Sequence, residues 1–231
     1  MAADSSLPRV EAAFAALGGV FVSPMRQLAE RASACRGFVF DWDGVFNSGA
    51  KGDGAASSFS EADSMGLNLL RYGWWRSQGR LPSVAVITGE QNEVAQRFAA
   101  REHFDAIYSG VKNKVAALEH FCTAEALRPD ELAVVFDDVN DLGMAARAGV
   151  RVLVKRDASP LLGDYVVRNG LADYVTGSRS GAHAVREAAE LLLGLIGAFD
   201  DVVARRSEFD PDYVRYFAAR QAVTTRFEHA P

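Results

Sequence analysis

FVFDWDGVFNSG, at residues 38–49, joins a short apolar run to two aspartates and a glycine. An apolar run without polar alternation is typical of a strand that is buried on both faces, as in a parallel sheet covered by helices on each side. Such sheets bind ligands outside the carboxyl ends of their strands. Asp41 and Asp43 follow the run at that end, and Gly44 permits a tight turn out of the strand. The segment therefore predicts both the fold class and the place of a site.

The centre of the chain alternates similar apolar runs with longer segments of helical pattern. The further predicted strands are SVAVITG (83–89), AIYSG (106–110), LAVVFDD (132–138), VRVLV (150–154) and ADYVT (172–176). The predicted helices cover residues 64–77, 91–102, 113–122, 141–148 and 181–195. This alternation predicts an α/β fold, a Rossmann-like doubly wound parallel sheet with helices on both faces.

Helical additions flank this core. The expected divisions are an N-terminal helical extension at 1–35, the core at 36–196 and a C-terminal helical tail at 197–231. Residues 8–35 have the pattern of one or two amphipathic helices that break near Gly18 and Gly19.

Residues 198–228 read as further helix, with Asp210 as a cap and Pro211 in a first turn. Two interpretations of this tail stay open at this point. It is either a helix docked over its own core or a flap that reaches the active site of a neighbouring subunit.

The composition gives no reason to expect binding to nucleic acid or to a membrane. Hydrophobic residues make up 49% and charged residues 24% of the 231-residue chain, and the net charge is −5. A net negative chain is not attracted to nucleic acid or to anionic lipid, and the longest apolar stretch, 191–199, is too short to span a bilayer. The chain start lacks a secretory signal and the two cysteines form no metal-binding pair, so we expect a cytoplasmic protein.

Polar and charged residues gather after the predicted strands. They are Asp41, Asp43, Thr88, Lys114, Asp137, Asp138 and Asp141. A carboxylate can attack a phosphate ester only if cations neutralise the phosphate oxygens, and clustered carboxylates suit Mg²⁺. A lysine adds positive charge, a hydroxyl holds a phosphate oxygen, and a second carboxylic acid can protonate the leaving oxygen. This set predicts phosphate-ester cleavage through an aspartyl-phosphate intermediate.

Four segments resemble, in order and spacing, the motifs of haloacid dehalogenase (HAD) superfamily phosphatases. They are FVFDWDGVFNSG (38–49), VITG (86–89), Lys114 within GVKNKVAAL, and DDVNDL (137–142). A closer resemblance, over residues 36–195, is to 3-deoxy-D-manno-octulosonate 8-phosphate phosphatases and their relatives acting on nonulosonate 9-phosphates. That group shows a run similar to ADYVTGSRSGAHAVREAAELLL (172–193). The resemblance implies a HAD-like fold and a magnesium-dependent phosphatase acting on a small phosphorylated sugar or sugar acid.

The resemblance also implies roles for the matching residues. Asp41 would be the nucleophile and Asp43 the general acid/base. Thr88, Gly89 and Lys114 would bind the transferring phosphoryl group.

The same resemblance implies a magnesium site. The ion would be held by the carboxylate of Asp41, the backbone carbonyl of Asp43 and the carboxylate of Asp137. Asp141 and Asp138 would support the site by positioning the lysine of the third motif or metal-bound water.

The chain offers no room for the cap domain that many superfamily members carry. About twenty residues separate Gly44 from Asp63, enough for a β-hairpin that turns near 51–54 but too few for a domain. The resembling phosphatases shape their uncapped sites by forming tetramers. We therefore expect a homo-oligomer, a tetramer, with the 45–62 hairpin at its interface.

Three positions depart from the resembling phosphatases. Ala62 and Glu90 each replace an arginine, and Phe136 replaces a glycine. Losing two arginines weakens recognition of a substrate carboxylate, and Arg179 or the C-terminal arginines are candidate replacements. The exact substrate stays open, as do two other functions. One is a catalytically silent binding or scaffold protein of the same fold, and the other is a phosphotransferase.

Overall fold

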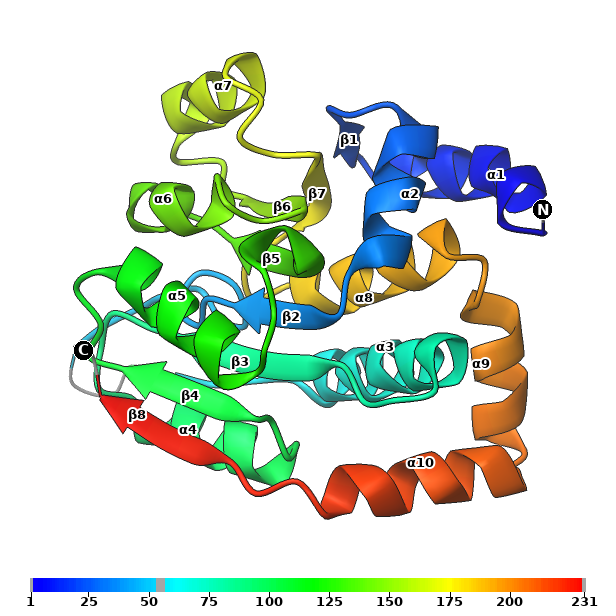
Figure 1. The fold of residues 1–231 in the computed structure, drawn as a ribbon. Coiled ribbons are helices and arrows are strands. Elements are labelled where there is room, and N and C mark those ends of the chain that lie inside the picture. Colours follow the sequence, from blue (N-terminus) through cyan, green and yellow to red (C-terminus); the bar gives the residue numbers. More distant parts are fainter. Residues whose placement is uncertain (1, 53–56, 230–231) are drawn as a thin grey trace.

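An eight-stranded sheet forms the centre of the computed structural model, which describes residues 2–52 and 57–229 (Figure 1). Its strands are β1 (Val20–Phe21), β2 (Gly37–Phe40), β3 (Ser83–Ile87), β4 (Ala106–Ser109), β5 (Leu132–Phe136), β6 (Val150–Lys155), β7 (Tyr174–Arg179) and β8 (Arg226–His229). They lie in the order β1-β7-β6-β5-β2-β3-β4-β8, and every neighbouring pair is parallel except β1 with β7. The six strands predicted for the core are all present, and the predicted α/β fold with a mainly parallel sheet is confirmed.

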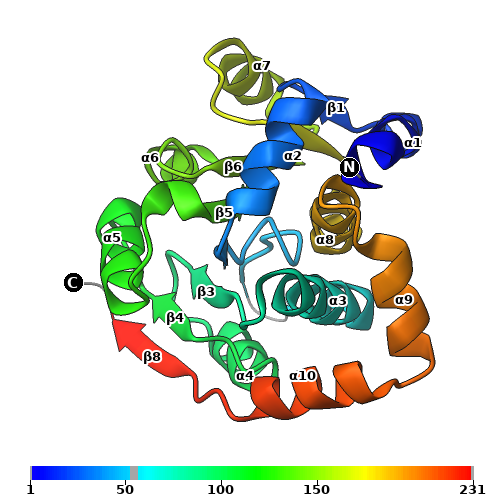
Figure 2. The same cartoon turned by 45° about the vertical axis from the view of Figure 1, so that its right-hand side comes forward.

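Helices cover both faces of the sheet, as Figure 2 shows. They are α1 (Ala2–Ala16), α2 (Met25–Ala34), α3 (Glu61–Gln78), α4 (Glu93–Arg101), α5 (Lys114–Ala124), α6 (Leu142–Ala145), α7 (Pro160–Arg168), α8 (Ala184–Leu195), α9 (Phe199–Ser207) and α10 (Pro211–Gln221). Along β2, Phe38 and Phe40 belong to the core shared with α3, α4 and α8, whereas Val39 belongs to the core shared with α5 and α6. The strand is continuously apolar because both of its faces are buried.

The central strand β2 lies between β3, the next strand along the chain, and β5, which comes later. Phe40 pairs in register with Val86 on one side and with Val135 on the other. The order of strands across the sheet therefore reverses between β2 and β5. A crevice opens at the carboxyl ends of strands at such a switch point, and the loops after β2, β3 and β5 meet there.

The N-terminal extension packs on α8 and adds one strand to the sheet. α1 ends ahead of Gly18 and Gly19, so the predicted break between two helices is confirmed. The short strand β1, which was not predicted, then pairs antiparallel with β7. A side chain on Gly19 would collide with the ring of Tyr174, so glycine is required where the extension crosses β7.

The C-terminal tail docks on its own core. In α10, the hydroxyl of Tyr213 donates to Asn68 Oδ1 at 3.1 Å and the hydroxyl of Tyr216 donates to the Asn68 carbonyl at 3.0 Å, which joins the tail to α3. The prediction of helix through residue 228 is wrong at its end, because the chain leaves α10 and forms β8 beside β4. β8 is a largely exposed strand stabilised by pairing with β4, so its own sequence carries no apolar pattern.

Two helices on the face of the sheet that α5 covers differ from the prediction. The helix predicted over residues 141–148 is reduced to a 3-10 turn, Val139–Asp141, followed by α6. The helix α7 was not predicted, and its Leu161 and Tyr165 are exposed, so it has no clear apolar stripe. None of the described helices has the length and apolar character needed to cross a membrane.

The segment after the first motif does not form the predicted β-hairpin in the residues described. Residues 45–52 and 57–60 are turns and loop, with one isolated bridge between Asp43 and Asn47. The predicted turn near 51–54 lies partly outside the described residues.

Candidate active site

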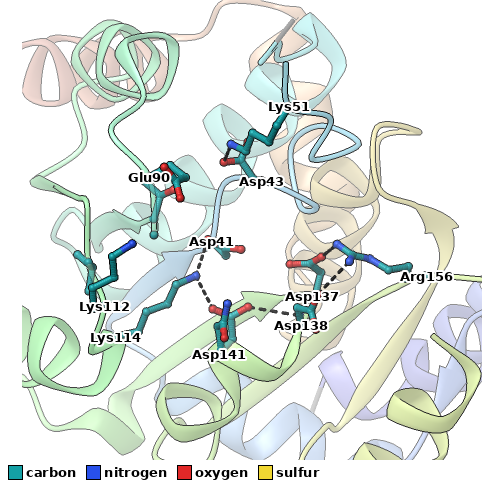
Figure 3. Close-up of a pocket in the computed structure, with 14 residues that line it drawn as sticks. Asp41, Asp43, Lys51, Glu90, Lys112, Lys114, Asp137, Asp138, Asp141 and Arg156 are labelled. Carbon is teal, nitrogen blue, oxygen red and sulfur yellow. Dashed lines mark hydrogen bonds and ion pairs between the residues drawn. The ribbon is translucent and has the colours of Figure 1, made fainter. Parts of the chain in front are cut away.

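A cavity of about 300 Å³ opens at the carboxyl ends of β2, β3 and β5 (Figure 3). Its lining contains all eight residues that the sequence predicted for the site: Asp41, Asp43, Thr88, Gly89, Lys114, Asp137, Asp138 and Asp141. Six further residues complete the lining: Lys51, Glu90, Val111, Lys112, Asn140 and Arg156. The fold therefore brings together residues that are as far apart in the sequence as Asp41 and Arg156.

Lys114 joins two aspartates at the floor of the cavity. Its Nζ donates to Asp41 Oδ1 at 2.7 Å and to Asp141 Oδ1 at 2.6 Å, and all three side chains are buried. Burial alone would lower the pKa of Lys114, but the charges of Asp41 and Asp141 outweigh burial and raise it. Lys114 is therefore a fixed cation that orients the Asp41 carboxylate.

Burial and nearby negative charge disfavour the ionised form of Asp41 by more than Lys114 favours it. Its pKa is raised to about 6, first by burial and then by the charge of Asp141, against the opposing effect of Lys114. Its backbone N–H donates to the carbonyl of Val135 at 3.0 Å, which fixes the residue directly after the sheet pairing ends. A fixed backbone and a shifted carboxyl pKa at the same residue are typical of a functional carboxylate.

Asp137, directly after β5, adds a third buried carboxylate. One oxygen from each of Asp41, Asp137 and Asp141 lies within 4.8 Å of the others. Burial and the charge of Asp41 raise the pKa of Asp137 to about 8, although Arg156 opposes them. A divalent cation would relieve this excess of negative charge, and carboxylate oxygens are preferred ligands of Mg²⁺. The donors present fit the predicted magnesium ion and add the Asp141 carboxylate to the expected set.

Asp43 lies two residues after Asp41 on the same loop. Its Oδ2 pairs with Lys51, whereas its Oδ1 is buried and has no hydrogen-bond partner among the described residues. A buried carboxylate oxygen without a partner is costly unless a proton or a ligand joins it. The next residue, Gly44, has φ +90°, and a side chain there would collide with Asp137, so the tight turn predicted at this glycine is present.

The loop after β3 forms another wall of the cavity. The backbone N–H of Thr88 donates to the Tyr108 carbonyl at 2.9 Å, and the Thr88 carbonyl accepts from Val111 at 3.1 Å. A side chain on Gly89 would meet only the Val111 carbonyl, at an ordinary 3.7 Å. Packing within the protein therefore does not require this glycine, and its expected role toward a phosphate stays a prediction.

Trp42, between the two aspartates of the first motif, points away from the cavity and is fully buried. Its ring stacks on Phe46 with 4.6 Å between ring centroids, and its Nε1 donates to Ser57 Oγ at 2.7 Å. The amide of Asn92 donates to the same Ser57 oxygen at 2.6 Å. Trp42 thus anchors the motif loop and ties it to the segment ahead of α3.

Comparisons with known proteins show what the chain is similar to. No family model matches the chain. The 3-deoxy-D-manno-octulosonate 8-phosphate phosphatase of Escherichia coli is 36% identical over 118 residues, which are 51% of this chain and 59% of that protein. A structure from Legionella pneumophila, described as a HAD superfamily (subfamily III A) hydrolase, superposes with a TM-score of 0.66 at 28% identity, over 80% of this chain and 96% of that one. The chain therefore has a HAD-like α/β fold and is similar in sequence to these phosphatases.

A second solved structure is similar to this chain over most of its length. The 3-deoxy-D-manno-octulosonate 8-phosphate phosphatase from Moraxella catarrhalis, solved with a magnesium ion, a phosphate ion and a KDO molecule, superposes with a TM-score of 0.65 at 25% identity, over 79% of this chain and 99% of that one. No cap domain is present in the described residues. The described residues therefore form a HAD-like fold without a cap domain, as the spacing of the motifs predicts.

The sequence did not point to three cations that line the cavity. Lys51 pairs with Asp43, and Arg156 pairs with Asp137 and Asp138, while Lys112 stands at the mouth. None of them was assigned a role from the sequence. Proximity to a motif is a weak signal that applies to two of them, because Lys51 lies two residues after the first motif segment and Lys112 two residues before Lys114. Arg156 lies outside all four segments.

The positions where the chain departs from its relatives have different surroundings. Glu90 lines the cavity, so it can affect what binds there. Ala62 lies in α3 outside the lining, and Phe136 is fully buried in the sheet. Arg179, the proposed substitute for a lost arginine, pairs with Asp157 at 2.6 Å and does not line the cavity.

Proposed function

We propose that this protein is a magnesium-dependent phosphatase that hydrolyses a phosphomonoester of a small sugar or sugar acid through an aspartyl-phosphate intermediate. The observation that carries the proposal is the contact of Lys114 with Asp41 at the switch point of the sheet, beside the carboxylates of Asp137 and Asp141. A buried nucleophile, a fixed cation and a set of hard oxygen donors are the parts that phosphoryl transfer to a carboxylate needs.

In this proposal Asp41 attacks the phosphorus and Lys114 keeps its carboxylate in position. Magnesium, held by Asp41, Asp137, Asp141 and the Asp43 backbone carbonyl, would neutralise phosphate oxygens that otherwise repel the attacking carboxylate. The Lys114 ammonium adds a second positive charge next to the transferring group. The Thr88 hydroxyl and the Gly89 backbone bind the remaining phosphate oxygens.

Asp43 is the general acid and then the general base of this mechanism. Its unpaired Oδ1 gives a proton to the leaving sugar oxygen when the phosphorus–oxygen ester bond breaks. The same oxygen then takes a proton from the water that attacks the aspartyl-phosphate, which releases inorganic phosphate and regenerates both carboxyl groups. The pairing of Oδ2 with Lys51 keeps the reactive oxygen turned toward the substrate.

For the substrate we propose a sugar acid phosphate such as 3-deoxy-D-manno-octulosonate 8-phosphate, because named relatives act on it. One cation that lines the cavity, Lys112, forms no salt bridge with another described residue. It is therefore available to bind a substrate carboxylate. Glu90 lines the same cavity and favours hydroxyl groups rather than a second acid nearby.

The test is phosphate release from a panel of phosphorylated sugars and sugar acids, and from an aryl phosphate, with and without Mg²⁺. We expect release only with metal, and a loss of roughly 10³-fold or more in Asp41→Asn. Asp164→Asn, a matched change of an exposed aspartate on α7, should leave the rate unchanged. No release from any compound would favour a scaffold protein, and transfer to added alcohols in place of free phosphate would favour a phosphotransferase.

We also propose a homo-oligomer, a tetramer, because the cavity is uncapped and open to solvent. In the domain division that we propose, residues 36–196 form the catalytic unit, with the extension at 1–35 and the tail at 197–231 packed on it. A cytoplasmic location also stays a prediction. Light scattering tests the assembly, and a stable, fully active monomer would contradict it.

A further inference from the structure

Arg156 lies beside the carboxylate cluster although no motif contains it. It follows β6 directly, and its guanidinium pairs with Asp137 through Nη2 and with Asp138 Oδ2 through Nη1, the latter at 2.9 Å. Figure 3 shows that it approaches Asp137 from the side away from Asp41 and Lys114. One planar cation thus bridges two consecutive aspartates, a geometry that the short ammonium of a lysine does not reproduce.

The backbone that carries Arg156 is fixed on both sides. The N–H of Lys155 donates to Thr176 Oγ1 at 2.9 Å, and the Arg156 carbonyl accepts from Ser159 at 3.3 Å. The side chain of Arg156 is 31% exposed, whereas that of Asp137 is 2% exposed. Arg156 is therefore a partly exposed side chain on a fixed backbone, and its guanidinium contacts a buried carboxylate.

The charges of the cavity show what this arginine changes. Five aspartates line the inner cavity, and three cations, Lys51, Lys114 and Arg156, contact them. With all five carboxylates ionised, which is the form that binds a metal ion, two negative charges remain, and one divalent ion neutralises them. Without Arg156 three negative charges would face the ion, and a cation is attracted more strongly as the number of nearby carboxylates grows.

We propose that Arg156 is an internal counter-cation of the carboxylate cluster, which stabilises the cluster in metal-free protein and lowers its affinity for Mg²⁺. The inference rests on the proposed magnesium site. Its physical basis is the position of the guanidinium, which is close enough to share Asp137 with the ion but on the far side of that carboxylate. Arg156 therefore acts on the metal by charge, and it does not block the metal's place.

The test is calorimetric titration of the full chain with MgCl₂, which needs no turnover. Arg156→Gln should bind Mg²⁺ about tenfold more tightly than the unchanged protein, since one repelling charge is removed near the ion. Its metal-free melting temperature should be lower, and saturating Mg²⁺ should raise that temperature by more than in the unchanged protein. Arg179→Gln removes an exposed arginine whose salt-bridge partner among the described residues is Asp157, and it should match the unchanged protein in both measurements.

Magnesium affinity that is equal or weaker in Arg156→Gln would overturn the proposal, because Arg156 would then orient Asp137 for the metal or have no part in the site. If that variant does not fold, Arg156→Lys replaces it. Lysine cannot bridge both aspartates, so we expect a smaller gain in affinity, and no gain overturns the proposal as well. Failure here is distinct from failure of the phosphatase proposal, which is judged by phosphate release from the unchanged protein.

Discussion

Two buried aspartates at opposite ends of the same half of the sheet show how differently this fold treats negative charge. Asp173, ahead of β7, is fully buried and accepts hydrogen bonds from Ser23 Oγ at 2.6 Å, Arg31 Nη2 at 2.7 Å and the Arg151 backbone at 2.8 Å. Burial alone would raise its pKa, but Arg151, Ser23 and Arg31 outweigh burial and lower it. Asp137 is nearly as buried, yet its pKa is raised to about 8.

The difference separates a structural charge from a functional one. Around Asp173 the chain supplies enough donors to satisfy the carboxylate, and two of them, Ser23 and Arg31, come from the N-terminal extension. Around Asp137 the nearest groups include Asp41 and Asp141, which repel it. The fold thus supplies enough hydrogen-bond donors and cations for Asp173 but not for Asp137, which lies where a metal ion is needed. Functional sites often keep such unfavourable charge interactions at a cost in stability.

The largest effect is expected when the satisfied charge is removed. Asp173→Asn leaves Arg31 and Arg151 without their buried partner, and breaking a buried ion pair typically costs about 3 kcal/mol or more. Urea unfolding should show this loss in the free energy of unfolding, while Mg²⁺ affinity stays that of the unchanged protein. A stability loss no larger than that of the exposed-site variant Asp164→Asn would show that the two aspartates are not opposites.

The same stabilisation should depend on pH. The pKa of Asp173 is lowered from its ordinary value of 3.8, so its contribution is complete above that value and is lost as the pH falls through the lower, folded-state pKa. The difference in unfolding free energy between the unchanged protein and Asp173→Asn should therefore be largest near neutral pH and shrink below about pH 4. A difference that grows on acidification would reverse the sign of the argument.

Removing the undercompensated charge should have the opposite, smaller effect on stability. Asp137→Asn deletes a buried carboxylate next to Asp41 and keeps a side chain of the same shape, so metal-free protein should gain about 1 kcal/mol. The gain is limited because Arg156 loses one of its two partners. Calorimetry on the same variant should show Mg²⁺ binding weakened by a factor of roughly 100 or more. Lower stability together with unchanged Mg²⁺ binding would place Asp137 in the structural class.

What the sequence could predict follows the same division. The strand ends fixed Asp41, Thr88 and Asp137, because continuous apolar runs mark buried strands and polar residues after them gather at one edge. β8 and Arg156 escaped prediction, since the pairing of one and the ion pairs of the other depend on segments distant in the sequence. The described residues of the 45–62 segment do not form the expected hairpin, because glycines near 51–54 signal a turn but do not supply the paired strands around it.

The smallest expected effect concerns cations and extends the comparison to the mouth of the cavity. Arg151 is fully engaged with Asp173 and the Gly170 carbonyl, whereas Lys112 is exposed and forms no salt bridge with another described residue. A cation that has no partner in the described chain is available to a ligand.

Lys112→Ala should raise KM about fivefold for a sugar acid phosphate, with kcat unchanged. That factor is the expected contribution of one exposed charge-assisted contact. It should leave KM for an aryl phosphate without a carboxylate unchanged, and Arg168→Ala, an exposed cation on α7, should affect neither substrate. Equal increases for both substrates would place Lys112 at the phosphate, and no increase for either would remove it from substrate binding.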